Sequence, residues 1–212
     1  MSEKLSAIMQ DFMKYVNKID TENYVKNMLF CFAAPTILGI KSACLINFRR
    51  GNDNICKIWK RKADTWLSGL NIEWLLLNEF NKSNNALVLI YRRELLSGIL
   101  NSNEACEILK ARDYPLPDVD KCLECLKNKF CCCENCEMPH EIGIFLNYPP
   151  EDVKGFIENR NAKNKSHENL SYWKVYGDAV KARKTFEEYK RAECEAALLM
   201  LTCVNSQENI NR

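Results

Sequence analysis

Apolar residues recur every three or four positions over much of this chain, which is the spacing of an amphipathic helix. Asp20 and Thr21 are well placed to cap the second of these stretches, and Asp178 the last. The chain is therefore expected to be rich in helix. The helical pattern extends over residues 5–19, 24–32, 55–70, 95–100, 104–112, 118–130 and 179–203.

Four shorter stretches have the composition of β-strands instead. Ala43–Phe48 is a continuous apolar run, which is typical of a buried strand. Glu73–Phe80 and Ala86–Arg92 lie on either side of a polar turn and predict a hairpin. Tyr172–Tyr176 alternates between inward and outward positions. We therefore predict an α+β fold, with a small, mostly antiparallel sheet of about four strands covered by helices.

Length and composition indicate one ordinary globular domain. The chain has 212 residues, and we expect a single domain over residues 1–204 followed by a flexible tail over 205–212. The net charge of +2 offers no basic excess for binding the phosphates of nucleic acid. No apolar run approaches the ~20 residues that cross a bilayer, and the first residues do not resemble a signal peptide. We expect a cytoplasmic protein that binds neither nucleic acid nor membranes; the sequence indicates no oligomeric state.

The stretch from Pro139 to Asn159 predicts two short helices separated by a proline turn. His140 and Glu141 lie in the first turn of the first helix, where they can act as a general acid–base pair or as metal ligands. Gly143, one turn later, leaves room for a ligand or for another backbone. The alternative is that His140 packs locally and Glu141 only complements the helix dipole. A DNA-reading role is excluded because the second helix begins with carboxylates, which phosphates repel.

Several polar side chains beside loops and strand ends are candidates for binding a small anion. The segment Ala33–Gly39 is expected to be a loop of small residues, whose N–H groups together with Lys41 can hold a phosphate or a carboxylate. It lacks the spacing of a P-loop, so a plain connection from helix to strand is the alternative. The candidate ligand-binding residues are Lys41, Thr36, Arg92, Lys174, Tyr176 and Asp178.

The chain contains twelve cysteines, which in a reducing compartment are expected to be thiols, metal ligands or redox centres. Cys122 with Cys125, and Cys133 with Cys136, form two Cys-x-x-Cys pairs that suit a tetrahedral site for zinc or iron. The gap between the pairs is shorter than in zinc ribbons. The alternative is that some of these thiols are buried as small hydrophobic groups and that others are exposed and open to oxidation.

Three motifs carry a resemblance to a known family. Residues 139–153 read Pro-His-Glu-Ile-Gly-Ile-Phe-Leu-Asn-Tyr-Pro-Pro-Glu-Asp-Val, and residues 172–178 read Tyr-Trp-Lys-Val-Tyr-Gly-Asp. Residues 34–41 read Ala-Pro-Thr-Ile-Leu-Gly-Ile-Lys. Together they resemble a domain of unknown function from anaerobic bacteria, with the signature PHEIGxFLGYPxEDV…GYWKVYGD and an N-terminal APTLxGxK element. Asn147 stands where that signature has glycine. The resemblance covers nearly the whole chain and implies a link to iron or redox physiology, but no reaction.

These observations lead to two functional hypotheses. The first is a ligand- or metal-binding accessory protein of anaerobic iron or redox metabolism, with a small-molecule ligand or a redox protein as its partner. The second is an enzyme acting on a small anionic substrate, with His140 and Glu141 in acid–base roles. In that enzyme Lys41, Arg92 or Lys174 would hold the anion.

Overall fold

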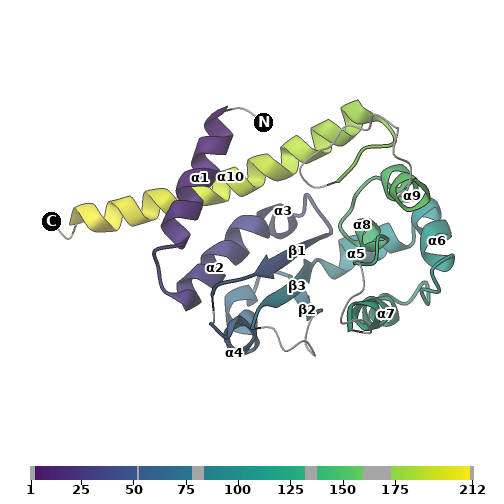
Figure 1. Ribbon diagram of the computed structural model, residues 1–212, viewed down its shortest axis with the longest axis horizontal. Coiled ribbons are helices and arrows are strands. Elements are labelled where there is room, and N and C mark those ends of the chain that lie inside the picture. Colours follow the sequence, from purple (N-terminus) through teal and green to yellow (C-terminus); the bar gives the residue numbers. More distant parts are fainter. Residues whose placement is uncertain (1–2, 52, 78–83, 132–137, 160–172, 211–212) are drawn as a thin grey trace.

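The computed structural model of the protein describes residues 3–51, 53–77, 84–131, 138–159 and 173–210 (Figure 1). A helix lies in every stretch for which one was expected. The helices are α1 (Glu3–Val16), α2 (Thr21–Phe32), α3 (Ala34–Ile37), α4 (Ile55–Leu67), α5 (Arg93–Leu100), α6 (Asn103–Lys110), α7 (Val119–Cys131), α8 (Ile142–Phe145), α9 (Pro150–Glu158) and α10 (Ala179–Ile210). The strands are β1 (Ala43–Phe48), β2 (Glu73–Leu76) and β3 (Ala86–Tyr91).

The sheet in the described residues has three strands in the order β1-β3-β2, and both pairings are antiparallel. The α+β class is therefore confirmed, whereas the prediction of about four strands is wrong by one. Of the predicted fourth strand, Tyr172 lies outside the described residues, and residues 173–176 form only an isolated bridge at Lys174. The end of the second predicted strand, residues 78–80, also lies outside them.

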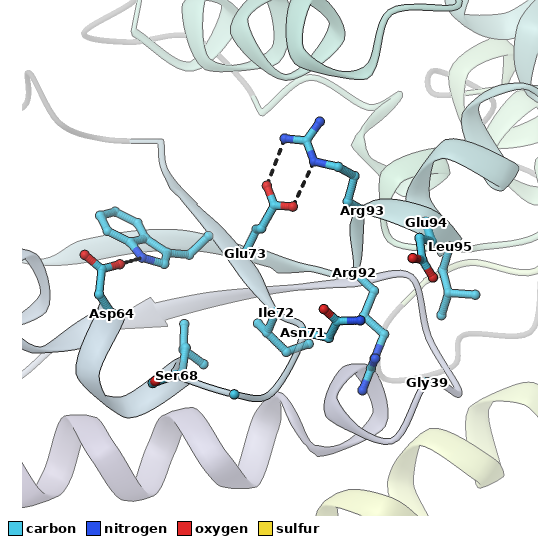
Figure 2. A pocket seen from close by; sticks show the side chains of 13 residues that line it. Gly39, Asp64, Ser68, Asn71, Ile72, Glu73, Arg92, Arg93, Glu94 and Leu95 are labelled. Carbon is cyan, nitrogen blue, oxygen red and sulfur yellow. Dashed lines mark hydrogen bonds and ion pairs between the residues drawn. The ribbon is translucent and has the colours of Figure 1, made fainter.

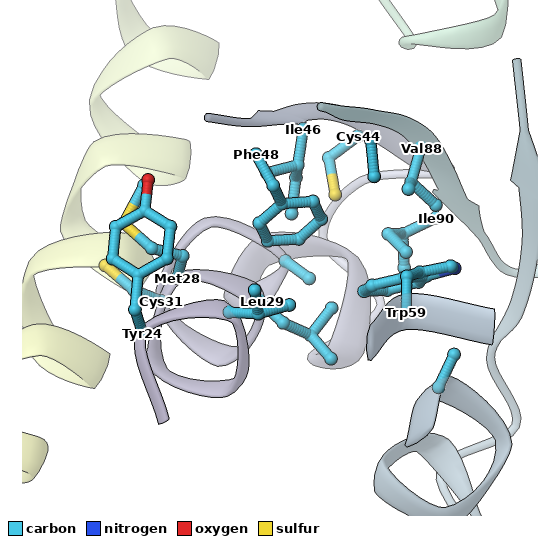
Figure 3. Packing of buried hydrophobic residues seen from close by; sticks show 14 of the residues in the cluster. Tyr24, Met28, Leu29, Cys31, Cys44, Ile46, Phe48, Trp59, Val88 and Ile90 are labelled. Carbon is cyan, nitrogen blue, oxygen red and sulfur yellow. The ribbon is translucent and has the colours of Figure 1, made fainter. Parts of the chain in front are cut away.

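One face of the sheet packs against α2 and α4 (Figure 3). Phe48 of β1 and Ile90 of β3 point towards these helices, as alternation along each strand requires. Trp59 of α4 is fully buried, and its ring lies 5.1 Å from that of Phe48 between centroids. The tryptophans of α4 therefore anchor the hydrophobic core on this face of the sheet, which is the first of the two large cores.

The opposite face of the sheet packs against α5, α7, α8 and α9, which gather on one side of the molecule in Figure 1. Leu89 and Tyr91 of β3 belong to this second core together with Phe145 of α8. The Ser42 hydroxyl donates a hydrogen bond of 3.1 Å to the main-chain oxygen of Phe145. Residues 139–153 are thereby attached to the start of β1.

The long helix α10 runs along the molecule and packs on α1, α2 and α3 (Figure 1). Its first half carries Phe186 and Tyr189, which pack with Trp173 and Val175 in a third, smaller cluster. The helix continues past Val204 to Ile210. No helix in the described ranges combines the length and the apolar character that crossing a membrane would need.

The segment Ala33–Gly39 is not the loop that its small residues predict. Its middle forms the one-turn helix α3, with Pro35 near its start. Proline fits the first turn of a helix because its missing N–H would have no helical partner there. The chain then turns at Gly39, whose φ of +75° is the left-handed conformation that glycine adopts without strain.

Candidate functional site

Asp152 joins the segment 139–153 to the segment that follows residue 172. Its carboxylate is buried and accepts three hydrogen bonds: 2.8 Å from Trp173 Nε1, 2.6 Å from the Tyr176 N–H and 2.7 Å from the Gly177 N–H. Tyr148 also stacks on Trp173, with 4.5 Å between ring centroids. These two motifs therefore form one packed unit, and Asp152 holds it together.

Lys41 lies inside the protein, between aromatic rings. Its Nζ is 5.4 Å from the centroid of Tyr148 and 4.9 Å from that of Tyr189, which are cation–π distances. Burial lowers the pKa of the Lys41 ammonium. Burial likewise raises the pKa of the neighbouring Cys44 thiol to about 11, although the Lys41 charge acts in the opposite direction. Thr36 is also fully buried.

Asn147 adopts a left-handed conformation with φ of 57°. Glycine reaches this region most easily, and asparagine is among the few other residues that tolerate it. The substitution of Asn147 for the signature's glycine is therefore compatible with the same backbone. Asn147 adds a hydrogen bond of 3.2 Å from its Nδ2 to the Tyr189 hydroxyl.

His140 and Glu141 face different neighbours. The buried Glu141 carboxylate accepts a hydrogen bond of 3.2 Å from the Tyr114 hydroxyl and lies 3.6 Å from Lys129 Nζ. The half-buried His140 ring packs edge-on against Phe156, with 4.9 Å between centroids. The charge of Glu141 is therefore balanced by that of Lys129. The role of His140 and Glu141 as an acid–base pair stays a prediction.

The space beside Gly143 is occupied by the protein itself. A Cβ added to Gly143 would lie 2.7 Å from a methyl group of Val153 and 3.2 Å from the Tyr148 ring. These contacts are close enough that any larger residue would force α8 and α9 apart. Gly143 therefore serves the approach of one segment to another, which is the second of the two roles expected for it.

The other candidate residues near this unit have local partners. Lys174 Nζ lies 5.9 Å from the centroid of Phe156, so that Lys174 and His140 contact the same ring. The Tyr176 side chain fills the space that a Cβ on Gly155 would need. The Asp178 carboxylate accepts hydrogen bonds from the N–H groups of residues 180 and 181, at 2.9 Å and 3.1 Å, and so caps α10 as expected.

Two of the four cysteines predicted to bind metal can be placed. Cys122 and Cys125 lie on α7, and burial raises the pKa of both thiols, that of Cys122 to about 11. Cys133 and Cys136 lie outside the described residues. In the part of the chain that is described, no group of three or more His, Cys, Asp or Glu side chains is arranged to hold a metal ion. The four-cysteine site for zinc or iron stays a prediction.

A pocket of about 680 Å³ lies where the end of α4, the start of β2 and the start of α5 meet (Figure 2). Gly39, from the turn after α3, also reaches it. This volume falls within the range of typical small-molecule sites. The lining residues are Gly39, Asp64, Leu67, Ser68, Gly69, Asn71, Ile72, Glu73, Trp74, Arg92, Arg93, Glu94 and Leu95.

Three of the charged groups in this pocket are engaged with one another or with neighbours. Arg93 Nε lies 2.8 Å from a Glu73 oxygen, and Arg93 Nη2 lies 2.7 Å from Asp120 (Figure 2 shows the pair with Glu73). The Arg93 guanidinium keeps the pKa of Glu73 below its usual value. Asp64 accepts a hydrogen bond of 2.8 Å from Trp74 Nε1.

Arg92 has a different environment. Its Nε donates a hydrogen bond of 2.8 Å to the main-chain oxygen of Thr36, and its Nη2 donates to that of Ile37. These acceptors are neutral, so they orient the guanidinium without cancelling its charge. Arg92 is also the N-terminal cap residue of α5, which has no side-chain cap hydrogen bond. The positive end of that helix dipole therefore adds to the charge of Arg92 in the same corner of the pocket.

Sequence reasoning identified Arg92 as a residue at the end of a strand but did not identify the rest of its pocket. Glu73 comes from another strand, and its pairing with Tyr91 across β2 and β3 brings it near Arg92. Asp64 comes from α4 and reaches the pocket beside Trp74 of β2. One local signal was present: the short turn before β2 contains Gly69 and Asn71, which both have positive φ. Such a turn places the end of α4 close to β2.

The comparisons with known proteins bear on the family alone. A family model described as "Protein of unknown function (DUF3793)" matches residues 29–210 of this chain. This supports the resemblance to a domain of unknown function, while the particular motifs and the origin in anaerobic bacteria stay predictions. Neither the comparison with curated proteins nor that with solved structures gave a match.

Proposed function

Because this chain belongs to the DUF3793 family, whose description states no activity, we propose a function from the structure: the protein binds a small organic anion in the pocket of Figure 2, with Arg92 as its main contact. The observation that carries the proposal is the environment of Arg92. Its guanidinium is fixed by two main-chain oxygens at the wall of a pocket large enough for a small molecule. Because the Arg92 guanidinium is already held in place, its side chain would lose little conformational entropy when a ligand binds.

The start of α5 supports an anion as the ligand. The first N–H groups of a helix have no helical partners, and those of Arg93, Glu94 and Leu95 belong to residues that line the pocket. The Glu94 carboxylate opposes an anion there, because it lies in the same first turn. The ligand contact is therefore assigned to Arg92 and the main chain, with Glu94 weakening it.

The experiment is a calorimetric titration of the whole protein with small carboxylates and with inorganic phosphate. Loss of one charge-assisted hydrogen bond is worth ~1.5–3 kcal/mol, so Arg92→Gln should weaken binding at least about tenfold. Arg92→Lys, which keeps the charge but not the fork of donors, should be intermediate. Arg61→Gln is the matched control, because Arg61 lies on α4 in a surface ion pair with Glu22. Equal binding by all four proteins would refute the proposal.

We further propose that this binding serves a cytoplasmic accessory protein of anaerobic iron or redox metabolism, the setting that the family resemblance implies. A bound metal and a redox partner protein belong to the same proposal. Metal analysis of the purified protein tests it: zinc or iron in whole-number ratio, lost in Cys133→Ser and after chelation, supports a cysteine site. Metal-free protein that still binds carboxylates would overturn the metal part of this proposal and leave the anion site unaffected.

The second candidate is an enzyme acting on a small anionic substrate near His140. One observation favours it: the His140 ring and Lys174 Nζ both contact the Phe156 ring, so that an imidazole and a cation share one neighbour. The hydrogen bond of the buried Glu141 carboxylate with Tyr114 weakens the paired role. His140→Ala should then abolish turnover while leaving anion binding at Arg92 unchanged. Loss of carboxylate binding in His140→Ala would instead locate the anion site at His140.

A further inference from the structure

The charges that line the pocket are not those of a site for a purely anionic ligand. The lining residues include two arginines, Arg92 and Arg93, and three acids, Asp64, Glu73 and Glu94. Because Arg93 is paired with Glu73, one guanidinium and two carboxylates remain. A ligand that carries only negative charge meets an excess of like charge there, which weakens its binding. A ligand that also carries a positive charge avoids this cost.

Glu94 is the acid nearest to Arg92 along the chain, and its charge has no partner. The Glu94 side chain is exposed, and its carboxylate forms no hydrogen bond or ion pair with any residue that the structure describes. Side chains two positions apart at a helix do not face each other, so Arg92 and Glu94 do not pair. Both line the end of the pocket where α5 begins (Figure 2). Two opposite charges are therefore available side by side along one wall.

Asp64 is the second acid whose charge is not compensated. It lies on α4 and accepts its hydrogen bond of 2.8 Å from Trp74 Nε1, which is a neutral donor. Figure 2 shows Asp64 at the other end of the pocket from Arg92 and Glu94. Asp64 thus adds to the negative charge of the pocket, whereas Glu94 is the acid placed beside the Arg92 guanidinium.

We propose that the ligand is a small amino acid, whose carboxylate binds Arg92 and whose ammonium group binds Glu94. This inference rests on the proposed function and names the ligand class of the same site. Each charge on such a ligand meets an opposite charge that the protein has not already paired. The Glu94 carboxylate weakens the binding of a simple anion, but it stabilises a ligand that carries both charges.

The experiment titrates the whole protein by calorimetry with three pairs of compounds that differ only in an amino group. The pairs are acetate and glycine, propionate and β-alanine, and butyrate and 4-aminobutyrate. In the wild type, at least one amino acid should bind about two- to fivefold more tightly than its partner carboxylate, the gain expected from one exposed ion pair. Arg92→Gln should weaken both members of that pair.

Glu94→Gln should change the two members of that pair in opposite directions. It should weaken binding of the amino acid, because the ammonium group loses its partner, and tighten binding of the carboxylate, because a like charge is removed. Loss of folded protein would weaken both, so the opposite signs separate a ligand contact from a structural effect. Glu104→Gln is the matched control, because Glu104 is an exposed acid in the first turn of α6, outside this pocket. It should behave as the wild type with all six compounds.

Three outcomes would overturn the inference. Amino acids that bind no more tightly than their partner carboxylates would exclude the amino acid as ligand and keep the anion site at Arg92. A preference for the amino acid that is lost in Asp64→Asn and kept in Glu94→Gln would place the ammonium group at Asp64 and contradict the assignment to Glu94. Failure of all six compounds to bind would overturn both this inference and the proposed function.

Discussion

Replacing Asp152 with alanine should destabilise the protein strongly, although the residue is small and no ligand contact is assigned to it. The substitution leaves three buried or half-buried donors without their acceptor: the Trp173 indole and the N–H groups of Tyr176 and Gly177. Each unsatisfied buried donor costs ~1–3 kcal/mol. The three effects are not additive, because residues 173–177 can move outward and reach water.

We therefore expect Asp152→Ala to lower the free energy of unfolding by about 3–5 kcal/mol, which is less than the sum of three such losses. Asp152→Asn, which keeps one acceptor oxygen but brings an NH₂ group towards donors, should cost about 2 kcal/mol. Urea unfolding followed by circular dichroism measures both. Glu158→Ala is the control: it removes an exposed carboxylate from the same helix and should change stability by less than ~0.5 kcal/mol.

A loss of less than ~1 kcal/mol in Asp152→Ala would refute the reasoning. It would mean that the segment after residue 172 is held mainly by the packing of Trp173 on Tyr148, and that the carboxylate contributes little.

Three further predictions concern single residues. Asn147→Gly should be nearly neutral in urea unfolding, because glycine relieves the left-handed backbone while the hydrogen bond to Tyr189 is lost; Asn147→Val should cost about 2 kcal/mol or more. Lys41 titrates below its ordinary pKa of 10.5 in the folded state, so the unfolded state binds more protons between the two pKa values. The stability of the wild type relative to Lys41→Met should therefore rise with pH up to that value; a flat difference from pH ~7 to ~10 would contradict the burial of a titrating amine. Glu94→Gln should tighten carboxylate binding about two- to fivefold by calorimetry, because it removes a like charge from the first turn of α5; weaker binding would mean that Glu94 contacts the ligand.

The fold could be predicted from sequence wherever one periodicity dominates a segment. The strand alternation in residues 172–176 correctly places Trp173 and Val175 on a buried face. It does not reveal that the Tyr176 N–H is taken by a side-chain carboxylate, Asp152, and not by a neighbouring strand. A local pattern shows which side chains turn inward, whereas the partner of a main-chain group depends on a residue more than twenty positions away. For that reason the predicted fourth strand is absent from the described sheet.

The site was harder to predict than the fold because charge alone does not show where a side chain points. Lys41 and Arg92 were both proposed as anion contacts; Lys41 Nζ lies beside the rings of Tyr148 and Tyr189, whereas Arg92 lines the pocket of Figure 2. Glu141, proposed to act beside His140, accepts a hydrogen bond from the buried Tyr114 hydroxyl, and its pairing with His140 stays a prediction. Each of these outcomes is decided by contacts between segments, which no spacing within one segment records.

The most direct test of the proposed anion site follows amide NMR signals during a titration with butyrate. We predict saturable shifts at the main-chain amides of Arg93, Glu94 and Leu95 and at the side-chain Nε–H of Arg92, with no shift around Leu199 on α10. Shifts centred on His140 and Phe156, with none from residue 92 to residue 95, would contradict the assignment of the anion to Arg92.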